Sequence, residues 1–315
     1  MDGPIPAAPA DPLAEALHLV HMDGAFYCRS ELRAPWGMTL PPLPGYMWFH
    51  VVTTGGLLLE AGDAVRTLVP GEVALVPRGE GHVLRSDPAA PAPGILELER
   101  EQLSDRYEVL RHGGDGAPTL LLCGAVRFGH PAAASLVGVL PEILHLDAER
   151  LQGTLALMAA EAREPRLGGE AVITRLADIL VIQALRAWME GDPEARTGWL
   201  GALRDEQIGR AIALIHREPA RDWTVASLAR ELAMSRSAFA ARFTTLVGEP
   251  AMAYVTRWRM QVALAALRDE HATVGELAGR LGYRSEAAFA RAFKRETGMP
   301  PGAVRRLPDA LAELT

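Results

Sequence analysis

Short apolar and β-branched runs between residues 46 and 128 are separated by glycine and proline, which is the pattern of strands joined by tight turns. Apolar runs at 48–53 and 73–76 are each followed by a turn signal, such as Gly55-Gly56 or the sequence that begins at Pro77. The regular spacing of these turns predicts a small antiparallel barrel or sandwich.

The period of the pattern changes after residue 131. Leu136, Leu140 and Ile143 recur at helical spacing, and long apolar segments follow at 151–158 and 171–190, so this region is expected to be helical. The segment 171–190 has enough apolar surface either for a dimer contact or for packing on its own barrel, and the sequence leaves both open. Its residues include Ile173, Leu176, Ile179, Leu180, Ile182, Gln183 and Leu185.

The last third of the chain contains an internal repeat, in which 224–247 aligns with 273–297. Each copy begins with a threonine cap and a short helix, then breaks tightly into a second helix with a Phe pair at i, i+4 on one face. This order predicts two helix-turn-helix units. The Phe pairs are Phe239 and Phe243 in the first copy and Phe289 and Phe293 in the second.

With the Phe pairs facing inward, the opposite face of each second helix is exposed and suits a major groove. A guanidinium group there can bond a guanine edge, so Arg291 is expected to read a base, while Lys294 and Arg295 are expected to contact phosphates. Arg242 could contact either a base or a phosphate, and its place beside Phe243 favours phosphate. A continuous helix over 251–268 would hold the recognition helices in successive grooves, roughly 34 Å apart. The predicted DNA-contacting residues are Arg236, Ser237, Ala240, Ala241, Arg242, Arg284, Glu286, Ala287, Arg291, Lys294 and Arg295.

Charge divides the chain in the same place. The 315 residues carry a net charge of −7, but 205–307 holds 16 Arg and Lys against 11 Asp and Glu, a net of +5. The rest of the chain has a net of −12. This asymmetry favours a basic nucleic-acid module joined to an acidic domain with another task. With no clean apolar span and no basic-then-apolar leader, we expect a cytoplasmic protein that does not enter a membrane.

The stretch 277–305 reads LAGRLGYRSEAAFARAFKRETGMPPGAVR and closely resembles the signature of the AraC/XylS family of transcriptional regulators. The resemblance covers about 100 residues. It implies a double helix-turn-helix DNA-binding domain controlled by an N-terminal domain, commonly in a homodimer that activates or represses genes. The family's usual Tyr near the end of the signature is Val304 here, a departure that affects packing more than readout.

Residues 71–82, GEVALVPRGEGH, fit the second cupin motif G(x)5PxGxxH at every fixed position and resemble a cupin barrel. The resemblance implies a metal set of three His and one Glu in cupin enzymes. Here His50 and His82 are present, but Val52 stands at the second His position and the Glu position falls at or near Gly56. The enzyme set is broken, so we do not expect an enzyme.

Three interpretations of the barrel interior remain open. Cys28, His50, His82 and Cys123 could surround one zinc ion as a Cys2His2 site, and oxidation of the thiols would make such a site a redox switch. Alternatively, an organic effector could occupy the barrel mouth, lined by Trp36, Tyr46, Trp48 and the two His. In the third interpretation, the two histidines are core residues inherited from a metal-binding ancestor.

The sequence therefore predicts an α+β chain, with a cupin-like β-barrel and helices followed by an all-α double helix-turn-helix domain. The predicted divisions are a disordered lead-in at 1–12, a sensor barrel at 13–130, a helical dimerisation segment at 131–192, a linker at 193–204, a DNA-binding domain at 205–307 and a tail at 308–315.

The predicted function is a sequence-specific transcriptional regulator, controlled by an effector, a metal or a redox signal in its N-terminal domain. The alternative is a cupin-type metalloenzyme with an accessory basic domain. The expected partners are double-stranded DNA, a second copy of the chain and, for an activator, RNA polymerase.

Overall fold

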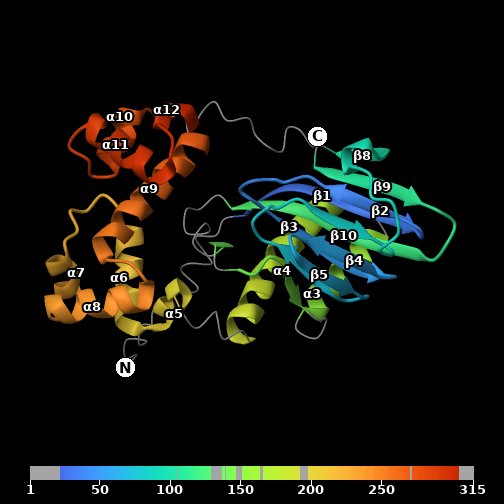
Figure 1. The fold of residues 1–315 in the computed structure, drawn as a ribbon, viewed down its shortest axis with the longest axis horizontal. Coiled ribbons are helices and arrows are strands. Elements are labelled where there is room, and N and C mark those ends of the chain that lie inside the picture. The colour runs from blue at the N-terminus through green and yellow to red at the C-terminus, as the bar shows by residue number, and fades with distance from the viewer. Residues whose placement is uncertain are drawn as a thin grey trace, which may run out of the picture. The chain divides into compact units, whose positions relative to one another are not determined.

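The computed structural model describes residues 22–104, 106–128, 137–138, 140–146, 151–163, 166–191, 198–269 and 272–304 (Figure 1). These residues form two compact units, a β-rich unit up to residue 191 and a helical unit from residue 198. The predicted lead-in at 1–12 and tail at 308–315 lie outside the described residues.

The β-rich unit consists of two sheets, which confirms the predicted β fold. The larger sheet has seven strands in the order β11-β6-β3-β10-β1-β9-β8, and the smaller has four in the order β2-β7-β4-β5. Neighbouring strands are antiparallel except β1 and β9, which are parallel. The strands are β1 Met22–Arg33, β2 Gly37–Leu40, β3 Tyr46–Thr54, β4 Leu57–Ala61, β5 Ala64–Leu68, β6 Val73–Val76, β7 His82–Arg85, β8 Arg100–Ser104, β9 Tyr107–Gly113, β10 Pro118–Phe128 and β11 Leu144–Leu146, with a 3-10 turn η1 at Ile95–Glu97.

Alternate residues of the large sheet point into a common apolar core, because successive side chains of a strand face opposite sides. On β1, Phe26, Cys28 and Leu32 belong to this core, while the outward Tyr27 lies close enough to Thr174 and Asp178 for both to affect its pKa. The helices α3 (Gln152–Arg163) and α4 (Gly169–Gly191) pack on each other, and α4 also contacts β1 and β11.

One sequence prediction in this unit needs correction. The apolar spacing at 136–144 predicted a helix, but Leu144 begins strand β11, which pairs with β6 and extends the large sheet. A short buried apolar run fits a strand as well as a helix, and pairing with β6 decides between them. The wide apolar face of α4 is mostly covered within its own unit, since Ile173, Leu180 and Leu185 are buried, whereas Ile179 is exposed.

The helical unit confirms both predicted helix-turn-helix copies and the helix that joins them. In the first copy α7 precedes α8, in the second α10 precedes α11, and α9 is continuous between the copies. The predicted linker at 193–204 contains helix α5, which packs on α6 and α8, so this part belongs to the helical unit. The helices are α5 Gly198–Arg204, α6 Glu206–Arg217, α7 Val225–Glu231, α8 Arg236–Val247, α9 Ala251–Asp269, α10 Val274–Arg280, α11 Glu286–Thr297 and α12 Pro301–Val304.

Local sequence explains where the helices of each copy begin and turn. Thr224 and Thr273 cap α7 and α10, each closing a capping box with the residue three positions on. The tight turn requires a left-handed residue, which is Gly282 (φ +77°) in the second copy and Ala233 (φ +53°) in the first. The first copy therefore makes the same turn without glycine.

Candidate nucleic-acid interface and barrel interior

Helix α11 presents a cationic face to solvent. Phe289 and Phe293 are fully buried, which turns Arg291 and Lys294 outward, and neither cation has a bonding partner among the described residues. The other predicted contacts of this copy, Arg284, Glu286, Ala287 and Arg295, are also exposed. Arg295 is exposed and pairs with its neighbour Glu296 at 3.2 Å, a surface ion pair that leaves its guanidinium available to a phosphate.

Helix α8 presents a face of small residues instead. Arg236, Ser237 and Ala241 are exposed as predicted, whereas Ala240 is half-buried and lies at the edge of this face. The Ala240 methyl group is partly covered by neighbouring residues, whereas that of Ala241 is exposed. Ala241 is therefore the better placed of the two alanines for contact with a thymine methyl.

Arg242 has a structural role that the sequence reading missed. Its Nε and Nη2 atoms donate to Asp205 Oδ2 at 3.2 and 2.6 Å, and Asp205 is also the N-cap of α6, accepting from the Ile208 amide. Burial raises the pKa of Asp205, but the bonds from Arg242 and Ile208 outweigh it and lower the pKa overall. Arg242 therefore ties α8 to α6, and its contact with a phosphate stays a prediction.

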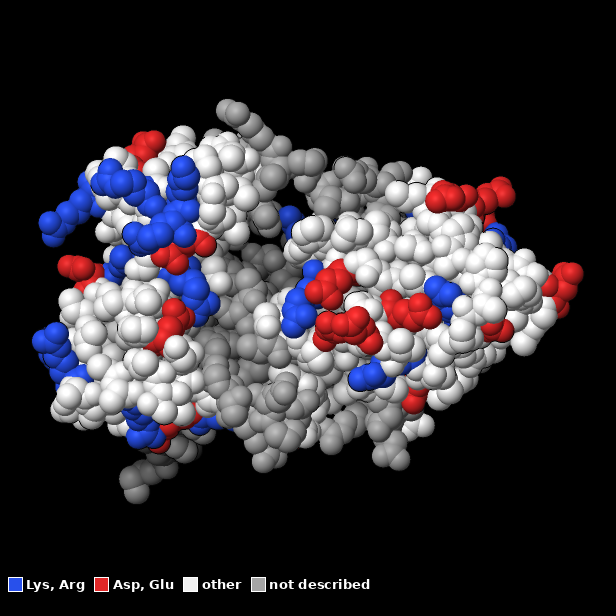
Figure 2. All heavy atoms as spheres, in the orientation of Figure 1, with Lys and Arg blue, Asp and Glu red and all other residues white. Residues whose placement is uncertain are grey.

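The surface charge follows the division seen in the sequence. In Figure 2, Lys and Arg side chains gather over the helical unit, and Asp and Glu side chains are frequent on the visible face of the β-rich unit. A positive surface attracts the phosphate backbone of DNA irrespective of sequence. The helical unit therefore carries both parts of a DNA interface, a cationic surface and two exposed recognition helices.

The four predicted zinc ligands line one row across the barrel interior. Cys28 on β1 lies opposite Cys123 on β10, and Cys123 lies opposite His50 on β3. His82, from the smaller sheet, faces His50 with 2.7 Å between their Nε2 atoms. The structure thus brings together residues that are far apart in the sequence, as the prediction required.

The two imidazoles bond to each other, which fixes their protonation. The Nδ1 atom of His82 donates to the Glu80 carbonyl at 3.0 Å, so its Nε2 accepts from Nε2 of His50. The Nδ1 atom of His50 is then a buried acceptor without a hydrogen-bond partner among the described residues. Burial lowers the pKa of His82 to about 4 and that of His50 well below its usual value, so both rings are neutral.

The thiols are buried and protonated. Burial raises the pKa of Cys28 to about 11 and that of Cys123 well above its usual range. The Cys28 sulfur lies 3.5 Å from the Ser30 hydroxyl, and both cysteines are free. A zinc ligand is a thiolate, which this apolar setting disfavours.

The predicted zinc site is not formed. Among the residues that the structure describes, no group of three or more His, Cys, Asp and Glu side chains is arranged to hold a metal ion. The facing imidazole nitrogens of His50 and His82 are already engaged with each other. These residues do not fit a Cys2His2 zinc site.

Glu108 is a member of this row that sequence reasoning missed. It lies beside Cys28 through the parallel pairing of β1 with β9, is 6% exposed, and accepts from Arg100 at 3.1 Å. Burial raises its pKa, against the opposing effect of Arg100. No local motif marks Glu108, because its position depends on a parallel strand pairing between distant segments.

The predicted effector-lining residues belong to the packed core. Trp36, Tyr46 and Trp48 are 1–5% exposed and lie in the apolar cluster of the barrel, so the prediction that they line an open mouth is corrected. Trp36 donates through Nε1 to Thr119 at 3.3 Å, and the Trp48 ring stacks on His50. Their bulk fills the interior instead of opening it.

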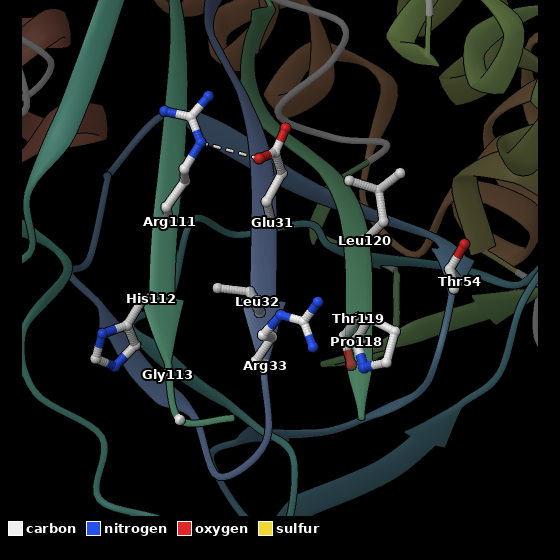
Figure 3. Close-up of a pocket in the computed structure, with 11 residues that line it drawn as sticks. Glu31, Leu32, Arg33, Thr54, Arg111, His112, Gly113, Pro118, Thr119 and Leu120 are labelled. Atoms are coloured by element: carbon white, nitrogen blue, oxygen red, sulfur yellow. Dashed lines mark hydrogen bonds and ion pairs between the residues drawn. The ribbon is translucent and has the colours of Figure 1, made fainter. Parts of the chain in front are cut away.

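A hollow of about 680 Å³ lies elsewhere, at the ends of β1, β9 and β10. Figure 3 shows Arg111 and Glu31 joined across adjacent strands, with Arg33 two residues further along β1. Arg33 has no carboxylate partner among the described residues, and its guanidinium donates to the Gly116 carbonyl. The lining residues are Glu31, Leu32, Arg33, Thr54, Arg111, His112, Gly113, Gly114, Pro118, Thr119 and Leu120.

Comparison with known proteins agrees with the division of the chain into a β-rich unit and a helical unit. A family model described as Cupin matches residues 11–190, and one described as Helix-turn-helix domain matches residues 228–307. A Streptomyces lividans protein named as an AraC-like transcription regulator is 34% identical over 306 residues, 95% of this chain and 99% of that protein. The HTH-type transcriptional regulator MtrA of Neisseria gonorrhoeae is 27% identical over 94% of this chain and 98% of its own.

Among solved structures, the DNA-binding domain of AdpA in complex with a target DNA is 31% identical over 31% of this chain and 88% of that chain, with a TM-score of 0.30. No helix among the described residues is both long and apolar enough to cross a membrane.

A cupin barrel joined to two helix-turn-helix copies defines a DNA-binding regulator, and the expectation of a non-enzyme agrees with the relatives. The chain belongs to the AraC-like transcription regulators with a cupin N-terminal domain.

Proposed function

We propose that this protein recognises specific DNA sequences with α8 and α11, one half-element for each helix. The observation that carries the proposal is the exposed face of α11, where Arg291 and Lys294 point away from the buried Phe pair without partners among the described residues. Arg291 supplies a bidentate donor for guanine, and Lys294 supplies a phosphate contact. Ser237 and Ala241 on α8 offer a hydroxyl and a methyl contact to the other half-element.

Selection of bound duplexes from a random pool, followed by footprinting, tests this function. The expected result is a preferred sequence with two half-elements about one helical turn apart. Equal binding to selected and scrambled duplexes would instead indicate a nonspecific DNA-packaging protein and reject the proposal.

Control by thiol oxidation in the barrel is the regulatory mechanism that we favour. Cys28 and Cys123 are directly opposite in an antiparallel pair, where Cα atoms are about 4.5–5.5 Å apart, a separation that a disulfide can bridge. Hydrogen peroxide would take two electrons and two protons from the thiols, which gives one S–S bond and two waters. Because burial raises both thiol pKa values, the reaction is expected to be slow at neutral pH and to accelerate as pH rises.

The thiol proposal is tested by treating the full chain with hydrogen peroxide and measuring its intact mass and DNA affinity. We expect loss of two hydrogen atoms per chain together with a change in affinity for the selected duplex. The Cys28→Ala and Cys123→Ala variants should lose both responses. A peroxide effect on DNA affinity that persists in these variants would exclude the thiol pair as its cause.

A homodimer through the outer face of α3 and α4 completes the proposed function. Leu157 on α3 and Val172 and Ile179 on α4 are 45–60% exposed, although apolar. Such a patch favours a protein contact. Sedimentation should show a dimer that Ile179→Glu converts to a monomer, and a monomeric wild-type chain would contradict this part. We place the regulator in the cytoplasm, and as an activator it would also contact RNA polymerase.

A further inference from the structure

The loop between α6 and α7, residues 218–223, is attached to the first helix-turn-helix copy by side-chain contacts. The Trp223 indole donates to the Glu218 carbonyl at 2.9 Å. Arg221 lies over the Trp223 ring at 4.1 Å and pairs with Glu218 and Glu231 at 3.2 and 2.5 Å. These contacts join the loop to α7. A residue that binds the loop therefore also restrains the position of the first copy.

Arg259, on the helix α9 that joins the copies, connects this loop with the second copy. Its Nε and Nη2 atoms donate to the carbonyls of Pro219 and Arg221 at 2.7 and 2.8 Å. The same guanidinium lies 5.8 Å from the centre of the Tyr283 ring, in the turn between α10 and α11. One side chain thus touches the first copy's loop and the second copy's turn.

Gly282 brings the two copies into direct contact at the same place. Its φ is +77°, and a Cβ atom there would lie 2.4 Å from the carbonyl oxygen of Ala220, in the loop of the first copy. That distance is too short for any side chain, so glycine is required both by the turn and by the contact between copies. The sequence pattern revealed only the first of these requirements.

We propose that Arg259 and Gly282 form a clamp between the two copies that sets the spacing of the two DNA half-elements read by one chain. A single joining helix can curve, whereas a helix braced by a second contact keeps α8 and α11 at one mutual orientation. Two linked recognition helices gain affinity only while their geometry matches the site. The clamp rests on the proposed DNA-binding function and adds a positioning role for residues that do not face DNA.

Three glycine-to-alanine variants separate the clamp from simple turn strain. Gly282, Gly248 and Gly298 all have a positive φ, between +77° and +88°, but of these three only Gly282 would place a Cβ atom within 4 Å of a residue from another part of the chain. We expect Gly282→Ala to bind the selected two-element duplex about tenfold more weakly and to discriminate less against duplexes with one base pair added or removed between the elements. Gly248→Ala and Gly298→Ala should keep the wild-type spacing preference.

Arg259→Lys separates geometry from charge. Lysine retains the cation but cannot donate to two carbonyls with a planar fork. Binding of a single-element duplex should stay unchanged, while discrimination between spacings should fall as in Gly282→Ala. If Arg259→Lys keeps the wild-type spacing preference, the positive charge alone is sufficient and the clamp is overturned.

A measurement without DNA keeps the clamp testable whatever the DNA result. In hydrogen exchange of the full chain, Arg259→Lys should speed exchange of amides at 218–223 and at 281–285 together, by about tenfold. Unchanged exchange at both places would overturn the clamp even if specific DNA binding is found. Faster exchange in a chain without sequence preference would support the clamp and reject the DNA-binding proposal alone.

Discussion

The β-rich unit keeps several polar side chains in its interior, whereas the helical unit keeps its polar side chains on its surface. The barrel buries Ser30, His50, His82 and Glu108 among apolar side chains. In the helical unit, by contrast, the buried positions that the structure describes are apolar or aromatic, and the cations of α11 lie outside. An exposed cationic face suits a polyanionic partner, whereas a buried polar row responds to changes in protonation or oxidation. The units should therefore respond to different perturbations.

The largest expected effect is on the core of the helical unit. Phe293 is fully buried against Phe289 and Leu277, so Phe293→Ala should lower the free energy of unfolding by about 3–5 kcal/mol. Urea unfolding followed by circular dichroism should show the helical transition at lower urea while the barrel transition stays in place. Ala287→Ser, on the exposed face of α11, is the matched control and should move neither. A shift of both transitions in Phe293→Ala would show that the units unfold together.

Acid should act on the barrel instead. The folded pKa of His82 is about 4, below the unfolded value near 6.5, so the unfolded chain binds the proton more readily. Stability is full above about pH 6.5 and is lost as pH falls toward 4, by about 3 kcal/mol for His82 alone. His50, whose pKa is also lowered, acts in the same direction.

Urea unfolding between pH 7 and pH 4 measures this loss in the barrel transition. The double variant His50→Leu, His82→Leu removes both rings, so its barrel stability should depend less on pH. An equal dependence in the double variant would assign the acid effect to other groups of the barrel; Glu108 is not among them, because its raised pKa favours the folded state as pH falls.

Removal of the base-reading arginine comes next in size. Arg291→Ala should weaken binding to the selected duplex by about 1–3 kcal/mol, with the fold intact, because a bidentate base contact is lost. Fluorescence anisotropy with selected and scrambled duplexes measures the change in specificity. Arg66→Ala removes one exposed cation from the barrel and serves as the charge control. Unchanged specificity in Arg291→Ala would exclude this residue from base readout.

The smallest effect is expected for the phosphate contact. Lys294→Ala should weaken binding to the selected and the scrambled duplex equally. It should also reduce the slope of log K against log salt concentration by about 1. Anisotropy over a series of salt concentrations gives the slope. A loss confined to the selected duplex would instead place Lys294 on a base.

The helix-turn-helix copies could be predicted because their signals are local. Thr224, the Phe pair and the turn lie within about two dozen residues, and an i, i+4 spacing fixes a helix face without reference to other elements. The exposed side of α11 follows directly from its buried side. The same spacing predicted that Ala240 lies on the exposed face of α8, but the structure places it half-buried at the edge of that face. At such an edge a small rotation of the helix changes a residue from exposed to half-buried.

The barrel site could be predicted only in part. The resemblance of residues 71–82 to the second cupin motif implied that His50 and His82 lie in the barrel interior, but strand order and register are set by tertiary packing. The parallel pairing of β1 with β9, which brings Glu108 beside Cys28, has no local signal. The density of the core likewise decided that Trp36 and Trp48 fill the interior.

The sequence by itself determined the two helix-turn-helix copies and their buried Phe pairs, because helix periodicity is a property of neighbouring residues. Only the tertiary structure decided which distant groups meet. It commits Arg242 to Asp205, sets Cys28 opposite Cys123, and seats Gly282 against Ala220. Such contacts depend on the packing of whole elements, and packing selects one register and one orientation from the many that local patterns allow.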